Sequence, residues 1–447
     1  PSWRPSWQER RYGPTRGPAN LRSRSMTSPH VTPPLVRDPH ADPVERASGG
    51  WIARVSLTCI AIWIGMYGPI QVLLGLQAAR FSPDHKELTL GIVTGAGAAV
   101  STIATPLFGA LSDRTTFRMG RRLPWVVGGT IGGAASLVLL AYAPGVGVMI
   151  LAWCLVQAFL HAAMAAVLAA IPDQVPVDQR GAVSGWFGVT QTLGVVVGTG
   201  VAATVGGIRA GYIACAALLL VFALPYVLRS NDIHLPRTHL RAFSWREFAR
   251  GFWIDPRQHP DFGWAWLTRF IINLSNAIGL LYLLYFLTDA VGRADPPGDL
   301  FVLTLIYAGC LIVTAVVFGV LSDRVGRRKI FVIASGFVMC VAGFTLAFSP
   351  TWTGALVGAV LLGSGFGVYT AVDFALITQV LPVATDRAKD LGITTVLMTG
   401  ERGADLADRT DHLLVVPSGH TARIQEVHLL WAHAWCEAVD LSMQDSG

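Results

Sequence analysis

The chain contains 447 residues, of which 52% are hydrophobic and only 14% charged, and its mean hydropathy is +0.50. A soluble domain of this length would be far less apolar, so the composition predicts a membrane protein. The net charge of +6 does not indicate nucleic-acid binding, because membrane topology explains better how the basic residues are distributed between apolar segments.

The first fifty residues differ in composition from the rest. Residues 1–50 hold nine prolines and eight arginines, with no apolar run long enough for a signal peptide or a helix. We expect this segment to be disordered and assign it no function. The sequence begins at Pro1, and Met26 is a candidate for the true start.

Ten apolar segments follow, each near the roughly 20 residues that a helix needs to cross a bilayer. Their approximate spans are 51–76, 88–111, 123–143, 147–170, 183–205, 209–228, 264–290, 301–322, 330–348 and 353–381. The sequence therefore predicts an all-α, multi-pass membrane protein. Five of the six cysteines lie in these spans without paired spacing, so we expect small buried side chains rather than a disulfide or a metal site, and no cofactor.

The basic residues predict the orientation of the chain in the membrane. Connections after even-numbered segments hold seventeen Arg or Lys residues, whereas connections after odd-numbered segments hold only Arg80, Lys86, Arg209 and Arg293. Because cytoplasmic loops carry the excess of basic residues, the N-terminus is expected in the cytoplasm. Ten crossings then return the C-terminus to the cytoplasmic side of the inner membrane.

Two similar loops indicate an internal repeat. FGALSDRTTFRMGRR (108–122) follows the second segment, and FGVLSDRVGRR (318–328) follows the eighth. The similarity continues downstream, since Gln174 lies 54 positions after Gly120 and Gln379 lies 53 positions after Gly326. Transporters are commonly built from such related halves. We expect a six-helix half, a polar connection and a second half.

These paired loops resemble the signature loop of the major facilitator superfamily, and the resemblance covers about 51–393. The longer first loop, SDRTTFRMGRRLPW, is similar to that of the sugar-carrying branches, which include the glycoside–pentoside–hexuronide symporters and the sucrose-type carriers. The resemblance implies a secondary active transporter with alternating access rather than an enzyme. Its expected partners are the bilayer and a small solute such as a sugar, with H+. The expected domains are residues 51–228, a cytoplasmic linker at 229–263 and an incomplete half at 264–393.

The repeated loops also predict a latch at the cytoplasmic side. Gly109 and Gly319 would let helix backbones approach closely, and Asp113 and Asp323 could face the positive N-terminus of a neighbouring helix. In the superfamily, the first-half aspartate faces helix eleven and its counterpart faces helix five. The basic members of the expected latch are Arg114, Arg121, Arg122, Arg324, Arg327 and Arg328. The alternative is that these arginines only set topology.

Polar residues inside apolar segments are costly and are therefore candidates for binding solute or a coupling ion. Besides one acidic residue, which is discussed next, these residues are Tyr67, Gln71, Gln157, His161, Asn273, Asn276, Tyr282, Tyr285 and Tyr369. Hydroxyls, amides and aromatic faces suit a sugar-binding cavity. The alternatives are interhelical hydrogen bonds for the amides and a packing role for His161, which could instead carry a proton.

Asp373 is the only acidic residue well inside an apolar segment. A buried carboxyl group there could take up and release a proton as the cavity alternates between the two sides. The alternative is a static pair with a donor that the sequence does not identify. Melibiose-type sodium symporters use acidic residues on helices two and four, whose interiors here have none. Proton coupling is therefore preferred to sodium coupling.

The second half departs from the pattern of the first. After Arg387–Gly392 the chain offers only ITTVLM before the charged stretch TGERGADLADRTD, which is too short and too polar to span a membrane. We therefore expect a major facilitator fold with ten of its twelve helices, followed by a small α/β fragment at 394–447. Transport is expected to be impaired by the loss of helices eleven and twelve.

The segment from about 391 to 441 resembles the C-terminal part of phosphoheptose isomerases. TTVLMTG and HLLVVPS match two strands, and residues 421–440 match the helix that follows. The metal ligands of that family fall on Gln425 and His433, but two ligands do not complete a zinc site, so we expect neither a metal nor isomerase activity. The sequence thus predicts a junction between unrelated genes at about 388–393. A genomic fusion, an assembly artefact and a designed chimera would look the same. Two other functions, a membrane-anchored isomerase and a non-transporting sensor that docks a partner through its tail, are less consistent with the sequence.

Overall fold

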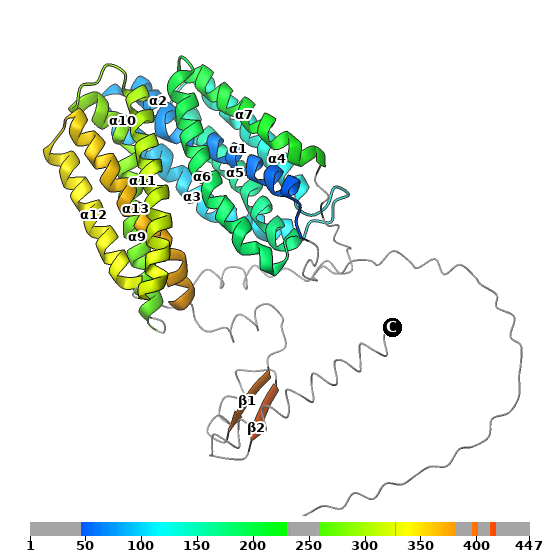
Figure 1. Cartoon of the computed structure of the whole chain (residues 1–447). Coiled ribbons are helices and arrows are strands. Elements are labelled where there is room, and N and C mark those ends of the chain that lie inside the picture. Colours follow the sequence, from blue (N-terminus) through cyan, green and yellow to red (C-terminus); the bar gives the residue numbers. More distant parts are fainter. Residues whose placement is uncertain are drawn as a thin grey trace, which may run out of the picture. The chain divides into compact units, whose positions relative to one another are not determined.

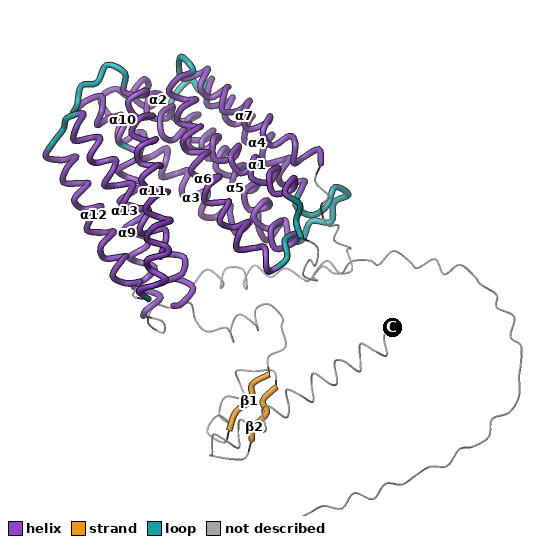
Figure 2. Tube along the Cα trace, viewed as in Figure 1, coloured by secondary structure: helices purple, strands orange, loops and turns teal. Residues whose placement is uncertain are grey.

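The computed structural model describes residues 46–229, 232, 257, 260–326, 328–380, 396–400 and 412–416. Within these residues, ten helices are long and apolar enough to cross a membrane. The ten apolar segments of the sequence are therefore confirmed as helices, and the protein is an all-α membrane protein with a small β element near its C-terminus. Figures 1 and 2 show two groups of helices, joined within each group by short loops.

The first group contains six membrane-length helices. The first of them is continuous through a π-helical turn, η1. The elements are α1 (Gly49–Gly68), η1 (Pro69–Leu73), α2 (Leu74–Phe81), η2 (Pro83–His85), α3 (Lys86–Asp113), α4 (Leu123–Ala141), α5 (Val146–Gln174), α6 (Val177–Thr204) and α7 (Ile208–Arg229). The Ser48 side chain caps α1 by accepting a hydrogen bond from the Trp51 amide, which satisfies one of the free donors at a helix start. Gly49 and Gly50, expected to belong to a disordered segment, are thus helical.

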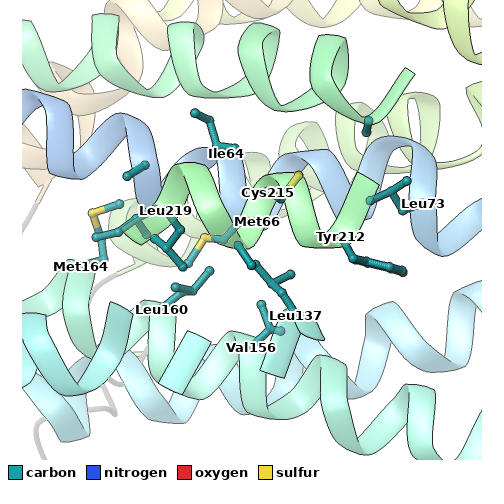
Figure 3. Close-up of a cluster of buried hydrophobic side chains, with 14 of the residues drawn as sticks. Ile64, Met66, Leu73, Leu137, Val156, Leu160, Met164, Tyr212, Cys215 and Leu219 are labelled. Atoms are coloured by element: carbon teal, nitrogen blue, oxygen red, sulfur yellow. The ribbon is translucent and has the colours of Figure 1, made fainter. Parts of the chain in front are cut away.

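The core of the first group is built from facing apolar side chains of α1, α4, α5 and α7. Leu137, Leu160 and Leu219, which lie together in Figure 3, all approach the position of a Cβ atom built on Gly65. Their side chains are fully buried. Because lipid is as apolar as these residues, close packing rather than the hydrophobic effect stabilises such helix contacts.

The crossing of α1 and α6 depends on two glycines. A Cβ atom on Gly68 would lie 2.9 Å from the Gly198 carbonyl oxygen, and one on Gly198 would lie 2.9 Å from the Gly68 amide nitrogen. Real Cβ atoms do not make such contacts, so both positions need glycine for the two backbones to meet. This crossing brings α6 against the C-terminal end of α1, which lies partway along the span Gly49–Phe81.

The second group contains four membrane-length helices. Its elements are α9 (Pro260–Leu281), α10 (Leu283–Tyr285), η4 (Phe286–Ala290), α11 (Pro296–Val325), α12 (Arg328–Phe348) and α13 (Trp352–Val380). The helix that follows the connection begins at Pro260, slightly before the expected boundary. In the first group α1 packs chiefly on α6 and α7, whereas its counterpart α9 packs mainly on α13 among the described elements.

Beyond α13 the structure describes two short strands, β1 (Val396–Gly400) and β2 (His412–Val416). They pair in parallel, with Val396 opposite His412 and Gly400 opposite Val416. Both strands fall within the two segments that the isomerase resemblance predicted as strands. The predicted helix, with Gln425 and His433, lies outside the described residues, as do most of 1–50 and most of the linker.

Candidate functional site

Buried ion pairs hold the loop after α3 at one end of the first group. Asp173, near the end of α5, accepts from both Arg121 and Arg122, with 2.9 Å from Arg122 Nε to Asp173 Oδ2. Arg122 also pairs with Asp113, Nη2 to Oδ1 at 2.6 Å, and donates from Nη1 to the Ser112 hydroxyl. This cluster joins α3, the start of α4 and the end of α5. The end of the bundle that carries it is called the arginine-rich end below.

A second carboxylate closes the start of α4. Asp232 Oδ2 accepts from the Arg122 amide at 2.6 Å and from the Leu123 amide at 2.8 Å, two donors that a helix start leaves free. Gly120, just before, has φ +99° and lies so close to Asp232 that a side chain would collide with it. Burial lowers the pKa of the Arg122 guanidinium, but the hydrogen bond and charge of Asp173, together with Asp113, raise it by more, so the net shift is upward.

Asp113, Arg121 and Arg122, three members of the expected latch, lie in a cluster within one half. Asp113 pairs with Arg122 of its own group. No described residue of another element lies within 4 Å of a Cβ atom placed on Gly109, so among the described residues no backbone approaches it closely in this conformation. Asp173 and Asp232 were missed by the sequence analysis. Asp173 directly precedes Gln174, and the repeat has Thr378 at the corresponding position, so the second half cannot form the same pair.

The second copy of the loop is described only in part. A Cβ atom built on Gly319 of α11 would lie 3.9 Å from the Cβ atom of Ala371 on α13, which is an ordinary van der Waals distance. Asp323 is helical, Arg324 is exposed, and Arg328 begins α12. Arg327 and the side chain of Asp323 lie outside the described residues. Arg114 and Arg328 each have an interaction partner.

The two groups of helices meet at the opposite end. The Tyr285 hydroxyl of α10 donates to the Gly75 carbonyl of α2 at 2.8 Å, in a buried setting. Lys86 pairs with Asp289, Nζ to Oδ2 at 2.6 Å, and its ammonium lies 4.9 Å from the centre of the Tyr285 ring. These contacts join residues about 200 positions apart, and Figure 1 shows α2 and α10 at the same end of the bundle.

Midway along the helices, polar side chains from both groups approach one another. Tyr307 of α11 donates to Asn276 Oδ1 of α9 at 3.1 Å, and both are buried. Tyr67 of α1 lies near the Gln191 side chain of α6 and near Tyr307. The sequence predicted Tyr67 and Asn276 as candidates, and the structure adds Gln191 and Tyr307.

Asp373 belongs to a polar cluster between α9 and α13. Its Oδ1 accepts from the Tyr369 hydroxyl at 2.6 Å, and its Oδ2 lies 3.1 Å from Arg269 Nη1. The Asn273 side chain lies near Tyr369 and donates to the Arg269 carbonyl at 2.8 Å. The donor that the sequence left unidentified is therefore Arg269, which lies within the span Gly263–Ala290. A search of the apolar spans for basic residues would have found it.

The remaining candidates lie in the first group and are not joined to this cluster by any described contact. His161 Nδ1 lies 2.9 Å from the carbonyl oxygen of Gln157 on its own helix. Gln71 and Gln157 are buried, and the Oε1 atom of each has no hydrogen-bond partner among the described residues. Within the same residues, no group of three His, Cys, Asp or Glu side chains could hold a metal ion.

Comparison with known proteins gives two separate matches. Residues 55–384 match the model of the Major Facilitator Superfamily. A different region of the chain is similar to phosphoheptose isomerases, at 49% identity over 57 residues for that of Mycobacterium bovis and 45% over 60 residues for that of Crocosphaera subtropica. Each of these matches covers 13% of this chain, but only 29% and 31% of those isomerases.

Solved transporter structures share the arrangement of helices. A mutant of the nucleoside transporter NupG is 13% identical with a TM-score of 0.57, over 76% of this chain and 86% of that one. A POT family transporter in complex with a thioalcohol-conjugated peptide is 10% identical with a TM-score of 0.58, over 75% and 85%. At these identities the likeness extends to the fold alone.

Proposed function

The chain belongs to the major facilitator superfamily and is a multi-pass membrane transporter, and from this premise we propose that it carries a small polar solute, such as a sugar, together with a proton. Transport would proceed by alternating access, with the solute site between the two groups of helices. As a membrane transporter, the protein has the lipid bilayer and a small-molecule solute as its partners.

The observation that carries this proposal is the cluster of Asp373, Tyr369 and Arg269. A carboxylate within a membrane span is costly unless it is paired, and such residues commonly mark proton or substrate pathways. The Asp373 side chain is 14% exposed and the Arg269 side chain 45% exposed, so the pair is reachable from outside the protein core. The nearby amides Asn273 and Asn276 supply donors and acceptors of the kind that solute hydroxyls need.

We place the arginine-rich end in the cytoplasm, with both termini on that side of the inner membrane. The support is the positive-inside rule, since the loops at this end carry most of the basic residues. In this orientation the Lys86–Asp289 and Tyr285–Gly75 contacts lie on the outer side. A carrier closed by these contacts would present its cavity to the cytoplasm. Residues 1–50, 51–228, 229–263, 264–393 and 394–447 are the proposed domains.

The chain as written is proposed to transport poorly. Helix α1 packs mainly against α6 and α7, whereas α9 has no equivalent pair of neighbouring helices among the described elements. Polar side chains such as Ser275 are consequently exposed, and an exposed polar group is costly in lipid. Two additional spanning helices would cover this side of α9.

The test is uptake into proteoliposomes driven by a pH gradient. The chain is compared with a version in which the residues after Ile393 are replaced by two spanning helices from a related carrier. We expect the second version to accumulate solute when the outside is acidic, and the first to accumulate little. Asp373→Asn in the active version is expected to abolish the pH-driven component. Equal uptake by the two versions, or unchanged pH-driven uptake by Asp373→Asn, would contradict the proposal.

A second proposal concerns the origin of the C-terminal region. The 49% identity to a phosphoheptose isomerase over 57 residues and the parallel pair of β1 and β2 support a fragment of a sugar isomerase domain joined to a transporter. Isomerase activity is not expected, because the match covers 29% of that enzyme. Reading genomic DNA across codons 385–395 tests whether the junction exists in a cell. A continuous transporter gene without the junction would identify an artefact.

A further inference from the structure

The two residues of the ion pair between α9 and α13, Arg269 and Asp373, differ in how exposed their side chains are. Both oxygens of Asp373 are occupied, one by the Tyr369 hydroxyl and the other by Arg269. Arg269 is 45% exposed and has five N–H donors in a planar fork that suits a carboxylate. Its exposed donors could therefore receive a second anion without any change of fold.

The charge balance of the pair depends on one proton. Arg269 carries a positively charged guanidinium group, and it lies within a membrane span, nine residues after the first residue of α9. Asp373 neutralises it. When the Asp373 carboxylate takes up a proton, the positive charge of Arg269 loses its counter-ion, which is unfavourable at this depth in a membrane.

We propose that the solute is a small carboxylate anion whose carboxylate binds Arg269 when Asp373 is protonated, so that the proton and the anion occupy the site together. This inference rests on the proposed function and specifies its solute. The bound anion restores the neutrality that protonation removes. Each partner therefore strengthens the binding of the other, and this coupling is reciprocal. A neutral sugar would leave the charge of Arg269 uncompensated.

The surroundings of the pair agree with this assignment. Asn273, exposed and one helical turn from Arg269, and the buried Asn276 and Tyr307 offer hydrogen bonds to the rest of the solute.

Other elements packed on α13 carry charged groups near the arginine-rich end. Asp323 lies on α11 one turn beyond Gly319, which is next to Ala371, and Arg328 and Lys329 begin α12. The direct charged partner of Asp373 is Arg269.

The experiment measures equilibrium binding to the full chain, purified in detergent at neutral pH, by titration calorimetry. The probes are three anions, each compared with an uncharged molecule of similar structure, called its neutral twin. The pairs are gluconate and sorbitol, galacturonate and galactose, and lactate and 1,2-propanediol. Repeating each titration in two buffers of different ionisation enthalpy gives the number of protons taken up. We expect at least one anion to bind about tenfold more tightly than its twin, with uptake of about one proton per anion.

Three variants assign the two roles separately. Asp373→Asn is expected to keep anion binding but to lose proton uptake, whereas Arg269→Gln is expected to weaken anion binding about tenfold or more. Arg269→Gln alone leaves the Asp373 carboxylate without its partner and could fail to fold. The double variant Arg269→Gln/Asp373→Asn removes both charges and takes its place in that event. The matched control is Arg293→Gln, which removes an arginine–aspartate pair between Arg293 in the loop before α11 and Asp299 in the first turn of α11. This variant is expected to bind as the unaltered chain does.

Two results would overturn the inference. One is that none of the three anions binds more tightly than its neutral twin, and the other is that anion binding proceeds without proton uptake. Either result leaves a proton-coupled carrier of neutral solute intact, as judged by uptake in proteoliposomes. Proton-linked anion binding without any uptake by the repaired version would instead support the inference and contradict the proposed transport.

Discussion

The Tyr285 hydroxyl and the Gly75 carbonyl join the two groups of helices through a buried hydrogen bond of 2.8 Å. The bond stands beside the Lys86–Asp289 ion pair and the contact of Lys86 with the Tyr285 ring. A buried hydrogen bond of this kind contributes about 1 kcal/mol. The bond therefore favours the conformation in which the groups touch at this end.

Tyr285→Phe is expected to open this end of the protein. Loss of about 1 kcal/mol changes a two-state population about fivefold. Spin labels placed on α2 and α10 would show a larger share of long distances by pulsed electron resonance. Tyr282→Phe is the matched control, because the Tyr282 hydroxyl makes only a 3.4 Å contact with the Glu87 carbonyl. Equal distance distributions in the two variants would contradict the role given to Tyr285.

Asp173→Asn is expected to destabilise the first group of helices by about 3 kcal/mol or more, because breaking a buried pair leaves charge without compensation. The side chains of Arg121 and Arg122 are both buried, and both pair with this carboxylate. The measurement is the unfolding temperature in detergent. Asp113→Asn serves as the control, since that side chain is 59% exposed and its loss is expected to cost at most about 1 kcal/mol. An Asp173 variant no less stable than the control would refute the prediction.

Gly198→Ala is expected to lower stability by about 1–3 kcal/mol, because the added methyl group would press on the α1 backbone. The nearest atom to such a methyl is the Gly68 amide nitrogen at 2.9 Å. Gly188→Ala is the matched control, because Gly188 lies on the same helix and no described residue of another element comes within 4 Å of its Cβ position. This variant should be neutral or stabilising. Thermal unfolding of the two variants decides the point, and similar losses would argue against a close crossing.

Both chain ends are expected on the side of the arginine-rich end. A cysteine introduced at Gly447 should react with a membrane-impermeant maleimide only after cells are opened. One introduced at Pro144, in the short loop between α4 and α5 at the opposite end, should react in intact cells. Labelling of Gly447 in intact cells would reverse the proposed topology.

The sequence could predict the ten spans because each is long and apolar enough to be recognised without its neighbours. It could also place Tyr369 and Asp373 on one helix face, four residues apart. The partner of Asp373 could not be predicted from Asp373 itself, because Arg269 lies on another helix about one hundred residues earlier. Asp113 shows the same limit, since its pairing with Arg122 depends on how the loop after α3 folds back.

The carboxylate that closes the start of α4 comes from a distant part of the chain. Asp232 lies beyond α7 and 110 positions after Arg122, whose amide it binds. A ribosome must therefore complete all six helices of the first group before this contact can form. Until then the first turn of α4 lacks its acceptor, and Gly120 lacks the neighbour against which it packs. During synthesis, the arginines can thus pair with Asp113 and Asp173 early, whereas the start of α4 gains its acceptor only after α7 is made.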